Sequence, residues 1–359
     1  MAPTEGFPLC PSFKRLLGLF GFLLILTWPL PSQACLCGTP QNIYNHYENS
    51  HAVFLGTALE VKFGKYSVTP LGSKGTDIEN REFSKRVTRL HIEKVWKGIQ
   101  TETVELTSRV TGCGYSFREG VQYLVYASLD EEQAWLTAIY CYRTKPAEEA
   151  QAEMMLLDNL KKGIDQKRIY EKLASLSQTH PGYKFRGQAL ELVSTAPESV
   201  APIDREEVIL SGLKDSHPYV RKGTAEIIYD HYYIDINSKV IRTLNQALDA
   251  EIGQEVSAPN AMQKESHLQT IRGISFTLAK VGGQPDQKRV LLILLKAFRD
   301  KNNPERHRAL GALGNVGEVA NEIVTELLEI LKEKPWTNLH YAAQYALPKL
   351  GYKGEWKLP

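Results

Sequence analysis

Recognisable catalytic motifs are absent from this sequence. It contains no His-Glu-x-x-His zinc motif, no Gly-x-Ser-x-Gly nucleophile elbow and no P-loop. The nine histidines are scattered, and no pattern pairs a nucleophile with a base. His46 and His51 lie near each other, but we expect them to flank the end of a short helix rather than bind a metal ion. We predict that the protein is not an enzyme and has no cofactor of its own.

A large excess of charge of one sign is also absent. The chain has 43 Lys and Arg residues against 41 Asp and Glu residues, which gives a formal net charge of +2. Such a near-neutral protein lacks the positive field that attracts a phosphate backbone. We therefore expect no nucleic-acid partner, and we interpret the basic segment 85–97 as the solvated face of an outer strand. A heparin-like polyanion is the alternative ligand for that face.

One long apolar run is present, but it is too short to span a membrane. Residues 16–28 are nearly all apolar, whereas a membrane helix requires roughly 18 to 20 such residues. Lys14 and Arg15 precede the run, two prolines follow it, and residues 32–34 place small side chains where a signal peptidase reads them. We predict that residues 1–34 are a signal peptide and that the mature chain has no transmembrane segment.

This export signal predicts a secreted, extracellular or periplasmic protein whose mature chain begins at Cys35. Lipidation of Cys35 is an alternative, and it would anchor the chain and block the α-amino group of that residue. The bacterial lipoprotein signal has a bulky aliphatic residue three places before the cysteine, but Ser32 occupies that place here. We therefore favour an unmodified amine on Cys35.

Cysteine is scarce, with five residues in 359. Cys10 is removed with the signal peptide, which leaves Cys35, Cys37, Cys113 and Cys141. An even number of cysteines in an exported chain predicts two disulfide bonds.

All four of these cysteines lie in a first region whose pattern is typical of β-strands. The candidate strands are rich in β-branched and aromatic residues or alternate in hydropathy, and they cover residues 52–61, 86–96, 103–107, 121–127 and 134–139. Five or so short strands within about 110 residues favour a small closed β-barrel, because closure hides the strand edges. We expect a short helix at 41–50, after Pro40, and a longer one at 147–162, where apolar residues recur at helical spacing.

From about residue 170 onward the pattern becomes helical. Three segments share a helix end, a turn with a proline, and a second helix with small residues on its inner face: residues 213–228, 298–313 and 331–346. Weaker copies lie at 187–194 and 271–281, and we expect an inter-helix loop at 253–263. The pattern is similar to HEAT repeats, in which stacked helix pairs share one core. The predicted fold is therefore multidomain, β plus α, with domains at 35–163 and 168–359.

The first domain resembles the inhibitory domain of the tissue inhibitors of metalloproteinases, within the wider netrin-like module. The matching motifs, in chain order, are Cys35-x-Cys37, Ala-Val-Phe-Leu-Gly at 52–56, Val-Trp-Lys-Gly at 95–98, Gly-Cys-Gly at 112–114, Gly-x-x-Tyr-Leu-Val-Tyr-Ala at 120–127, and Cys141-x-Arg143-Thr144. The resemblance covers about a third of the chain. It implies an OB-fold barrel with disulfides Cys35–Cys113 and Cys37–Cys141.

The resemblance also implies an inhibitory terminus. In that family the amine and carbonyl of the terminal cysteine chelate the catalytic zinc of a protease, and the next residue enters the specificity pocket. Here Cys35 would bind the zinc of a secreted metalloproteinase in trans, Leu36 would enter the pocket, and Cys37 would hold the terminus rigid through its disulfide. The chain departs from the family by lacking a third disulfide in this domain and by replacing the cysteine-rich C-terminal domain with helical repeats.

Two functions follow from these patterns. The first is an exported protein-binding protein that inhibits a metalloproteinase through Cys35. The second is a non-inhibitory interaction scaffold that binds partner proteins with the barrel and with the concave face of the repeats.

Overall fold

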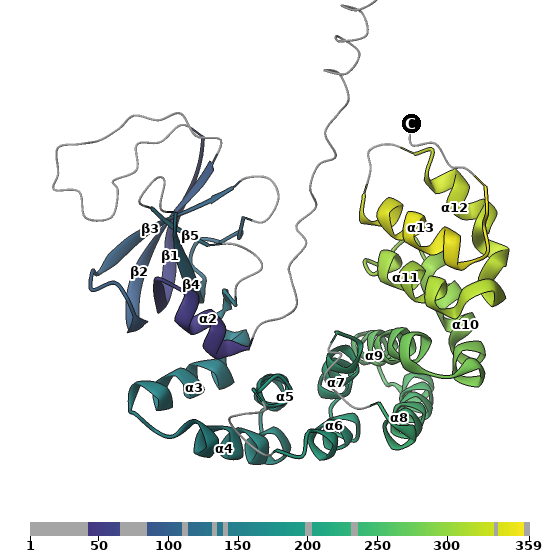
Figure 1. Cartoon of the computed structure of the whole chain (residues 1–359), viewed down its shortest axis with the longest axis horizontal. Helices are drawn as coiled ribbons and strands as arrows, with labels where there is room; N and C mark the ends of the chain where they lie inside the picture. Colours follow the sequence, from purple (N-terminus) through teal and green to yellow (C-terminus); the bar gives the residue numbers. More distant parts are fainter. Residues whose placement is uncertain are drawn as a thin grey trace, which may run out of the picture.

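The structure, a computed structural model, describes residues 42–64, 85–109, 114–130, 135–138, 143–197, 203–230, 236–333 and 337–354. Strands fill the first part of the chain and helices the rest (Figure 1). The predicted combination of a β region followed by an α region is confirmed. Among the described residues, no helix is both long and apolar enough to cross a membrane.

Five strands close into a barrel. They are β1 (Ala52–Gly64), β2 (Lys85–Lys97), β3 (Thr103–Arg109), β4 (Gln122–Asp130) and β5 (Trp135–Thr137). The order is β1-β2-β3-β5-β4, and β4 pairs back onto β1. All pairings in this circle are antiparallel except the one between β3 and β5. The closed barrel predicted from the strand pattern is confirmed.

Strands β1 and β4 are buried on both faces. Phe54 and Val125 point into the barrel core, whereas Val53 and Leu124 belong to a second cluster on the outside. The helices α2 (Ile43–Asn49) and α3 (Gln151–Lys161) cover that outer face and were both expected. A two-residue strand, β6 (Lys145–Pro146), pairs with β4 and is followed by a 3₁₀ turn, η1 (Ala147–Glu149).

The helical part consists of consecutive hairpins. Its helices are α4 (Gln166–Thr179), α5 (Tyr183–Ser194), α6 (Arg205–Leu213), α7 (Pro218–Asp230), α8 (Ser238–Ser257), α9 (Ala261–Val281), α10 (Gln284–Arg299), α11 (Arg306–Val316), η2 (Gly317–Ile323), α12 (Val324–Ile330) and α13 (Asn338–Lys349). Each even-numbered helix from α4 packs on the next odd-numbered one, and α5, α7, α9, α11 and α13 pack in series. The hairpins form an arc with α4, α6 and α8 outside and α5, α7 and α9 inside (Figure 1).

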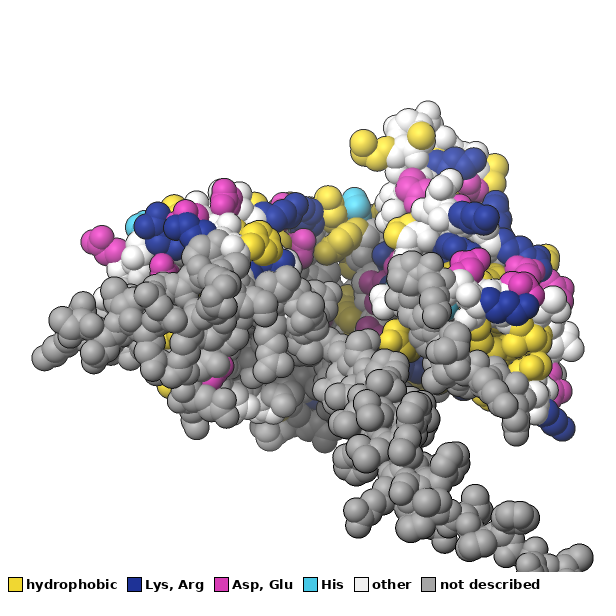
Figure 2. Space-filling view, turned by 90° about the horizontal axis from the view of Figure 1, so that it is seen from above, with side chains coloured by type: hydrophobic (Ala, Val, Ile, Leu, Met, Phe, Trp, Pro, Cys, Tyr) yellow, Lys and Arg dark blue, Asp and Glu magenta, His cyan; other side chains and the backbone are white. Residues whose placement is uncertain are grey.

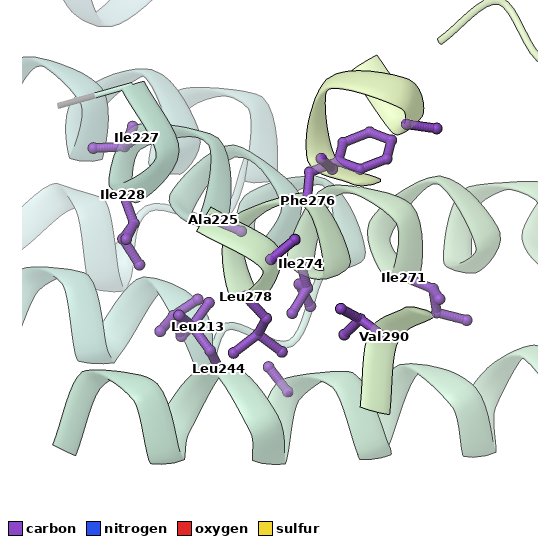
Figure 3. Packing of buried hydrophobic residues seen from close by; sticks show 14 of the residues in the cluster. Leu213, Ala225, Ile227, Ile228, Leu244, Ile271, Ile274, Phe276, Leu278 and Val290 are labelled. Carbon is purple, nitrogen blue, oxygen red and sulfur yellow. The ribbon is translucent and has the colours of Figure 1, made fainter. Parts of the chain in front are cut away.

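One continuous apolar core runs through these hairpins from Ile43 of α2 to Leu350 after α13. Leu213, Leu244, Ile274 and other residues from several helices meet between the two layers (Figure 3). Gly212 lets α6 approach its neighbours, because a Cβ there would lie 2.2 Å from the side chain of Leu190. The helix–turn–helix pattern expected around residues 213–228, 298–313 and 331–346 matches hairpins of the structure.

Buried arginines link three successive hairpins to the next one. Arg186 of α5 donates to both carboxylate oxygens of Asp215, at 2.7 and 2.8 Å, in the turn before α7. Arg221 of α7 donates to Glu251 of α8. Arg272 of α9 lies 3.4 Å from Asp300, directly after α10. The same device therefore recurs at three successive junctions.

The loop expected at residues 253–263 is a wrong prediction. Helix α8 continues to Ser257 and α9 begins at Ala261, so only residues 258–260 lie between them. Glu251 is fully buried, and its carboxylate pairs with His267 Nδ1 at 2.7 Å, which joins the end of α8 to the start of α9. Tertiary pairing of these polar residues outweighs the loop-like composition of the segment.

A buried ionic network joins the barrel to the helices. Glu153 of α3 is 2% exposed and accepts from the Tyr126 hydroxyl of β4 at 2.7 Å. Arg143 donates to both its oxygens, at 2.8 and 3.0 Å, and Lys145 lies 3.0 Å away. Burial opposes ionisation of Glu153, but Arg143 and Lys145 outweigh it and lower its pKa to about 2. The boundary between domains 35–163 and 168–359 stays a prediction.

Candidate functional site

The sequence-predicted inhibitory terminus lies outside the described residues. This applies to Cys35, Leu36 and Cys37, and equally to Cys113 and Cys141. The zinc-binding role of Cys35 and the disulfides Cys35–Cys113 and Cys37–Cys141 therefore stay predictions.

Arg143 and Thr144 are the two described residues of the last motif of the resemblance, and both connect the β6 segment to neighbouring elements. The Thr144 hydroxyl accepts from the backbone N–H of Tyr126 at 2.9 Å and donates to its carbonyl at 3.2 Å. Arg143 reaches beyond Glu153 to Glu191 of α5, at 3.1 Å. These residues therefore hold the barrel against the first hairpin.

The two neighbouring histidines flank the end of α2, as expected. His46 lies in its last turn and is buried, with its ring edge toward Tyr126. Burial, and then the charge of Arg143, lower the pKa of His46. His51 Nδ1 accepts from the backbone N–H of Leu129 at 3.1 Å. Within the described part of the chain, no three His, Cys, Asp or Glu side chains are grouped so that they could hold a metal ion.

A groove with a volume of about 540 Å³ lies on the inner side of the helical arc. Its lining residues come from β6, η1, α5, α7 and α9, and include Lys145, Glu149, Gly187, Gln188, Glu191, Tyr219, Lys222, Gly223, Glu226, Asp230, Gln269 and Thr270. The barrel segment and three hairpins therefore build it together.

The start of α7 fixes the most exposed aromatic side chain of this groove, Tyr219. Its backbone N–H donates to His217 Nδ1 at 3.2 Å, and burial lowers the pKa of His217, which keeps that nitrogen available as an acceptor. The Asp215 carboxylate accepts from the backbone N–H of His217 at 2.8 Å and also forms the ion pair with Arg186. The Tyr219 ring meets the Tyr183 ring edge to face at 5.6 Å and remains 44% exposed.

Glycines line the inner side of α5 and α7. A Cβ on Gly187 would lie 3.1 Å from Tyr219 Cε1, so glycine there lets the ring lie close against α5. A Cβ on Gly223 would meet no atom within 4 Å. Gly223 therefore leaves open space in the groove that a larger side chain would fill.

One amide side chain holds the two walls of the groove together. Gln188 of α5 donates to the Glu148 carbonyl of η1 at 3.0 Å and accepts from the Ala152 N–H of α3 at 3.1 Å. Gln188 is buried, and both the oxygen and the nitrogen of its side-chain amide have backbone hydrogen-bond partners, as buried polar groups require. This pair of bonds sets the distance between the barrel segment and the first hairpin.

The groove carries four carboxylates and two lysines. Glu191 is partly buried, yet Lys145 and Arg143 outweigh that burial and lower its pKa. Burial first, and then Glu149 and Glu191, raise the pKa of Tyr219. Elsewhere, side chains of both signs are mixed over the visible surface of the barrel and of the last helices (Figure 2). Carboxylates therefore outnumber lysines among the residues that line the groove.

The sequence contained a partial signal for this site. The repeat pattern includes segments 187–194 and 213–228, and it predicts that their small residues form contacts between paired helices. That interpretation fits Gly187, which lies against Tyr219 of α7, but Gly223 opens onto the groove. The approach of β6 and η1 to α5 left no pattern in the sequence.

No protein-family model matches the chain, and no curated protein matches it. A solved crystal structure of an engineered protein from the Northeast Structural Genomics Consortium is similar with a TM-score of 0.36 and 19% identity, covering 57% of this chain and 89% of that chain. A likeness at this level carries no argument about function.

Proposed function

We propose that this chain is an exported protein-binding protein that holds an extended segment of a partner protein in the groove between η1, α5, α7 and α9. The observation that carries the proposal is the groove itself, because five elements from both parts of the chain converge to build it. The arc of hairpins acts as a HEAT-like solenoid, whose concave face serves for binding.

Several features support this architecture. The strand order β1-β2-β3-β5-β4, closed by β1 and β4, is that expected of an OB-type barrel. The recurring arginine links at Arg186, Arg221 and Arg272 support a repeat origin of the hairpins. A half-exposed tyrosine in a concave site is typical of protein-binding surfaces.

The test is to fill the groove without disturbing the fold. Gly223→Leu places a side chain in open space on α7, and Gly253→Leu does the same on α8, away from the groove. Both changes favour a helix, since glycine costs about 1 kcal/mol relative to good helix formers. A phage-displayed library of random peptides is panned on the full chain, and the enriched peptides are measured on both variants.

We expect enriched peptides to bind the parent chain and Gly253→Leu equally, and to bind Gly223→Leu at least tenfold more weakly. Peptides whose affinity is the same for all three proteins, or a library without enriched peptides, would contradict the proposal.

The second candidate function is inhibition of a secreted zinc metalloproteinase through Cys35 and Leu36. The closed barrel favours it, because the family that the first domain resembles presents its terminus on such a barrel. In this proposal the amine and carbonyl of Cys35 chelate the zinc, which has an open coordination position in a protease. The disulfides Cys35–Cys113 and Cys37–Cys141 hold the terminus, and peptide mapping without reduction should find these two pairs.

Inhibition is measured on a panel of secreted zinc proteases with the mature chain. One alanine added before Cys35 replaces the amine by an amide and should abolish inhibition. Leu36→Gly should weaken it by roughly ten- to a hundredfold, since about 1.5 to 3 kcal/mol of side-chain burial is lost. Inhibition that survives the added alanine would exclude chelation, and no inhibition at micromolar concentration would leave the groove as the binding site.

A further inference from the structure

We infer that the segment bound in the groove carries a basic side chain, arginine or lysine, whose cation lies on the ring of Tyr219 beside Glu149 and Glu191. This inference rests on the proposed function of the groove and names the chemistry of its partner.

The ring of Tyr219 is held as a platform. Tyr183 meets it edge to face, and Tyr183 is itself stacked on His217 with ring centroids 3.6 Å apart and an interplanar angle of 2°. Gly187 lies close to its Cε1 atom, as described above. The part of the ring that stays exposed lines the groove. Such a ring attracts a cation placed over its face.

Most of the charges around the ring have the sign that a cation requires. Burial raises the pKa of Tyr219 most, and the carboxylates of Glu149, Glu191 and Glu226 raise it further. Lys184 lowers it, and this lysine pairs with Glu148 at 3.2 Å. Glu149 is exposed and makes no ion pair with the described residues. It is therefore available to a cation that enters from solvent.

The two lysines of the groove do not cancel this field. Lys145 lies 3.0 Å from the buried Glu153. Lys222 lies between Glu226 and Glu305, at 3.7 and 3.8 Å, and its stem rests on Gly273. Glu191 and Glu226 are paired as well, with Arg143 at 3.1 Å and with Arg308 at 2.7 Å. An acidic partner would have to break ion pairs to reach either lysine, whereas a basic partner meets the exposed Glu149 directly. Charge complementarity therefore favours the basic segment.

Three fluorescein-labelled peptides test the inference by anisotropy on the full chain: repeats of Arg-Ser, of citrulline-Ser and of Glu-Ser, all of the same length. Citrulline keeps the shape of arginine and removes its charge. We expect the arginine peptide to bind at least tenfold more tightly than the citrulline peptide and the glutamate peptide to bind more weakly still. The preference should decline between about 50 and about 200 mM salt.

Variants of the protein then distinguish the contribution of the Tyr219 ring from that of the Glu149 charge. Tyr219→Phe retains the ring and should keep the affinity for the arginine peptide within about twofold, whereas Tyr219→Leu should lower it about fivefold. Glu149→Gln should lower it about threefold. Glu102→Gln is the control, because Glu102 is an exposed carboxylate of the barrel that does not line the groove. It should change the affinity by less than about 1.5-fold.

Equal binding of the arginine and citrulline peptides, or equal binding by the parent and Tyr219→Leu, would overturn the inference. If library peptides that depend on Gly223 are neutral or acidic, the groove still binds a segment and only the basic partner is wrong. If no peptide binding depends on Gly223, the proposed function itself fails.

Discussion

The barrel and the helical arc are stabilised in different ways. The barrel encloses its own core, which is closed by the pairing of β4 with β1. The arc has no closure, and its single core continues from each hairpin to the next. A closed barrel depends on contacts between residues far apart in the chain, whereas stacked hairpins depend on their neighbours.

Helix α3 is where these two kinds of core meet. Leu157 packs on the barrel, and Leu156 packs in the core of the arc. The same helix carries the buried Glu153, and the groove lies beside it. Charge is buried at this junction, as it is between hairpins of the arc, and the candidate binding surface is built on that junction.

The largest expected effect comes from Glu153→Gln. Arg143 and Lys145 would then be left near an uncharged amide, and we expect the free energy of unfolding to fall by about 3 to 5 kcal/mol. Urea unfolding is followed by tryptophan fluorescence for the barrel and by far-ultraviolet circular dichroism for the helices. Glu148→Gln, which removes an exposed ion pair, should change stability by less than about 0.5 kcal/mol. Equal effects of the two changes would contradict the role of the junction.

Acid should weaken the same junction. The pKa of Glu153 is about 2 in the folded chain, against 4.5 for the ordinary group. Because the folded pKa is the lower one, this stabilisation is complete above about pH 5 and is lost as the pH falls toward 2. The parent should therefore lose its advantage over Glu153→Gln, about 3 kcal/mol, across that range. A stability difference independent of pH would exclude an ionised Glu153.

Cutting the chain on either side of α3 sharpens the comparison further. Fragments 35–163 and 168–359 are each expected to fold, the first mainly β and the second mainly α by circular dichroism. A fragment of 147–359 should exceed 168–359 in unfolding free energy by about 2 kcal/mol, because it restores the buried Leu156 to the arc. Equal stability of the two helical fragments would show that α3 belongs to the barrel alone.

The smallest expected effect is a gain. Gly223→Leu should raise the free energy of unfolding by about 0.5 to 1 kcal/mol, and Gly253→Leu should do the same, since both sites are open helix positions. Thermal unfolding of the two variants measures this. If Gly223→Leu alone lowers the free energy of unfolding, the groove cannot admit a side chain at that position. Weaker peptide binding by Gly223→Leu could then not be attributed to a blocked groove.

Local patterns predicted much of the fold. Alternation in hydropathy predicted the strands. The sequence around Pro218 predicted a turn followed by a helix, and α7 indeed begins at that proline, as is common at the first position of a helix. The pattern failed at residues 253–263, where glycine, serine and proline predicted a loop. There the polar contacts of Glu251 and the capping of α9 by Asn260 Oδ1, which accepts from Gln263 at 2.9 Å, decide where the helices end.

The two candidate sites also differ in how far the sequence predicts them. Sequence alone indicated the resemblance that predicts a role for Cys35 and Leu36, since the predicted cleavage site is a local feature. It also determined that helix hairpins follow the strands, because periodicity is local. Only the tertiary structure placed Lys145 and Glu149 beside Gly187, Tyr219 and Thr270, residues up to 125 positions apart in the chain. The physical reason is that Gln188 and the ion pairs of Arg143 act between elements, and no pattern within one element encodes them.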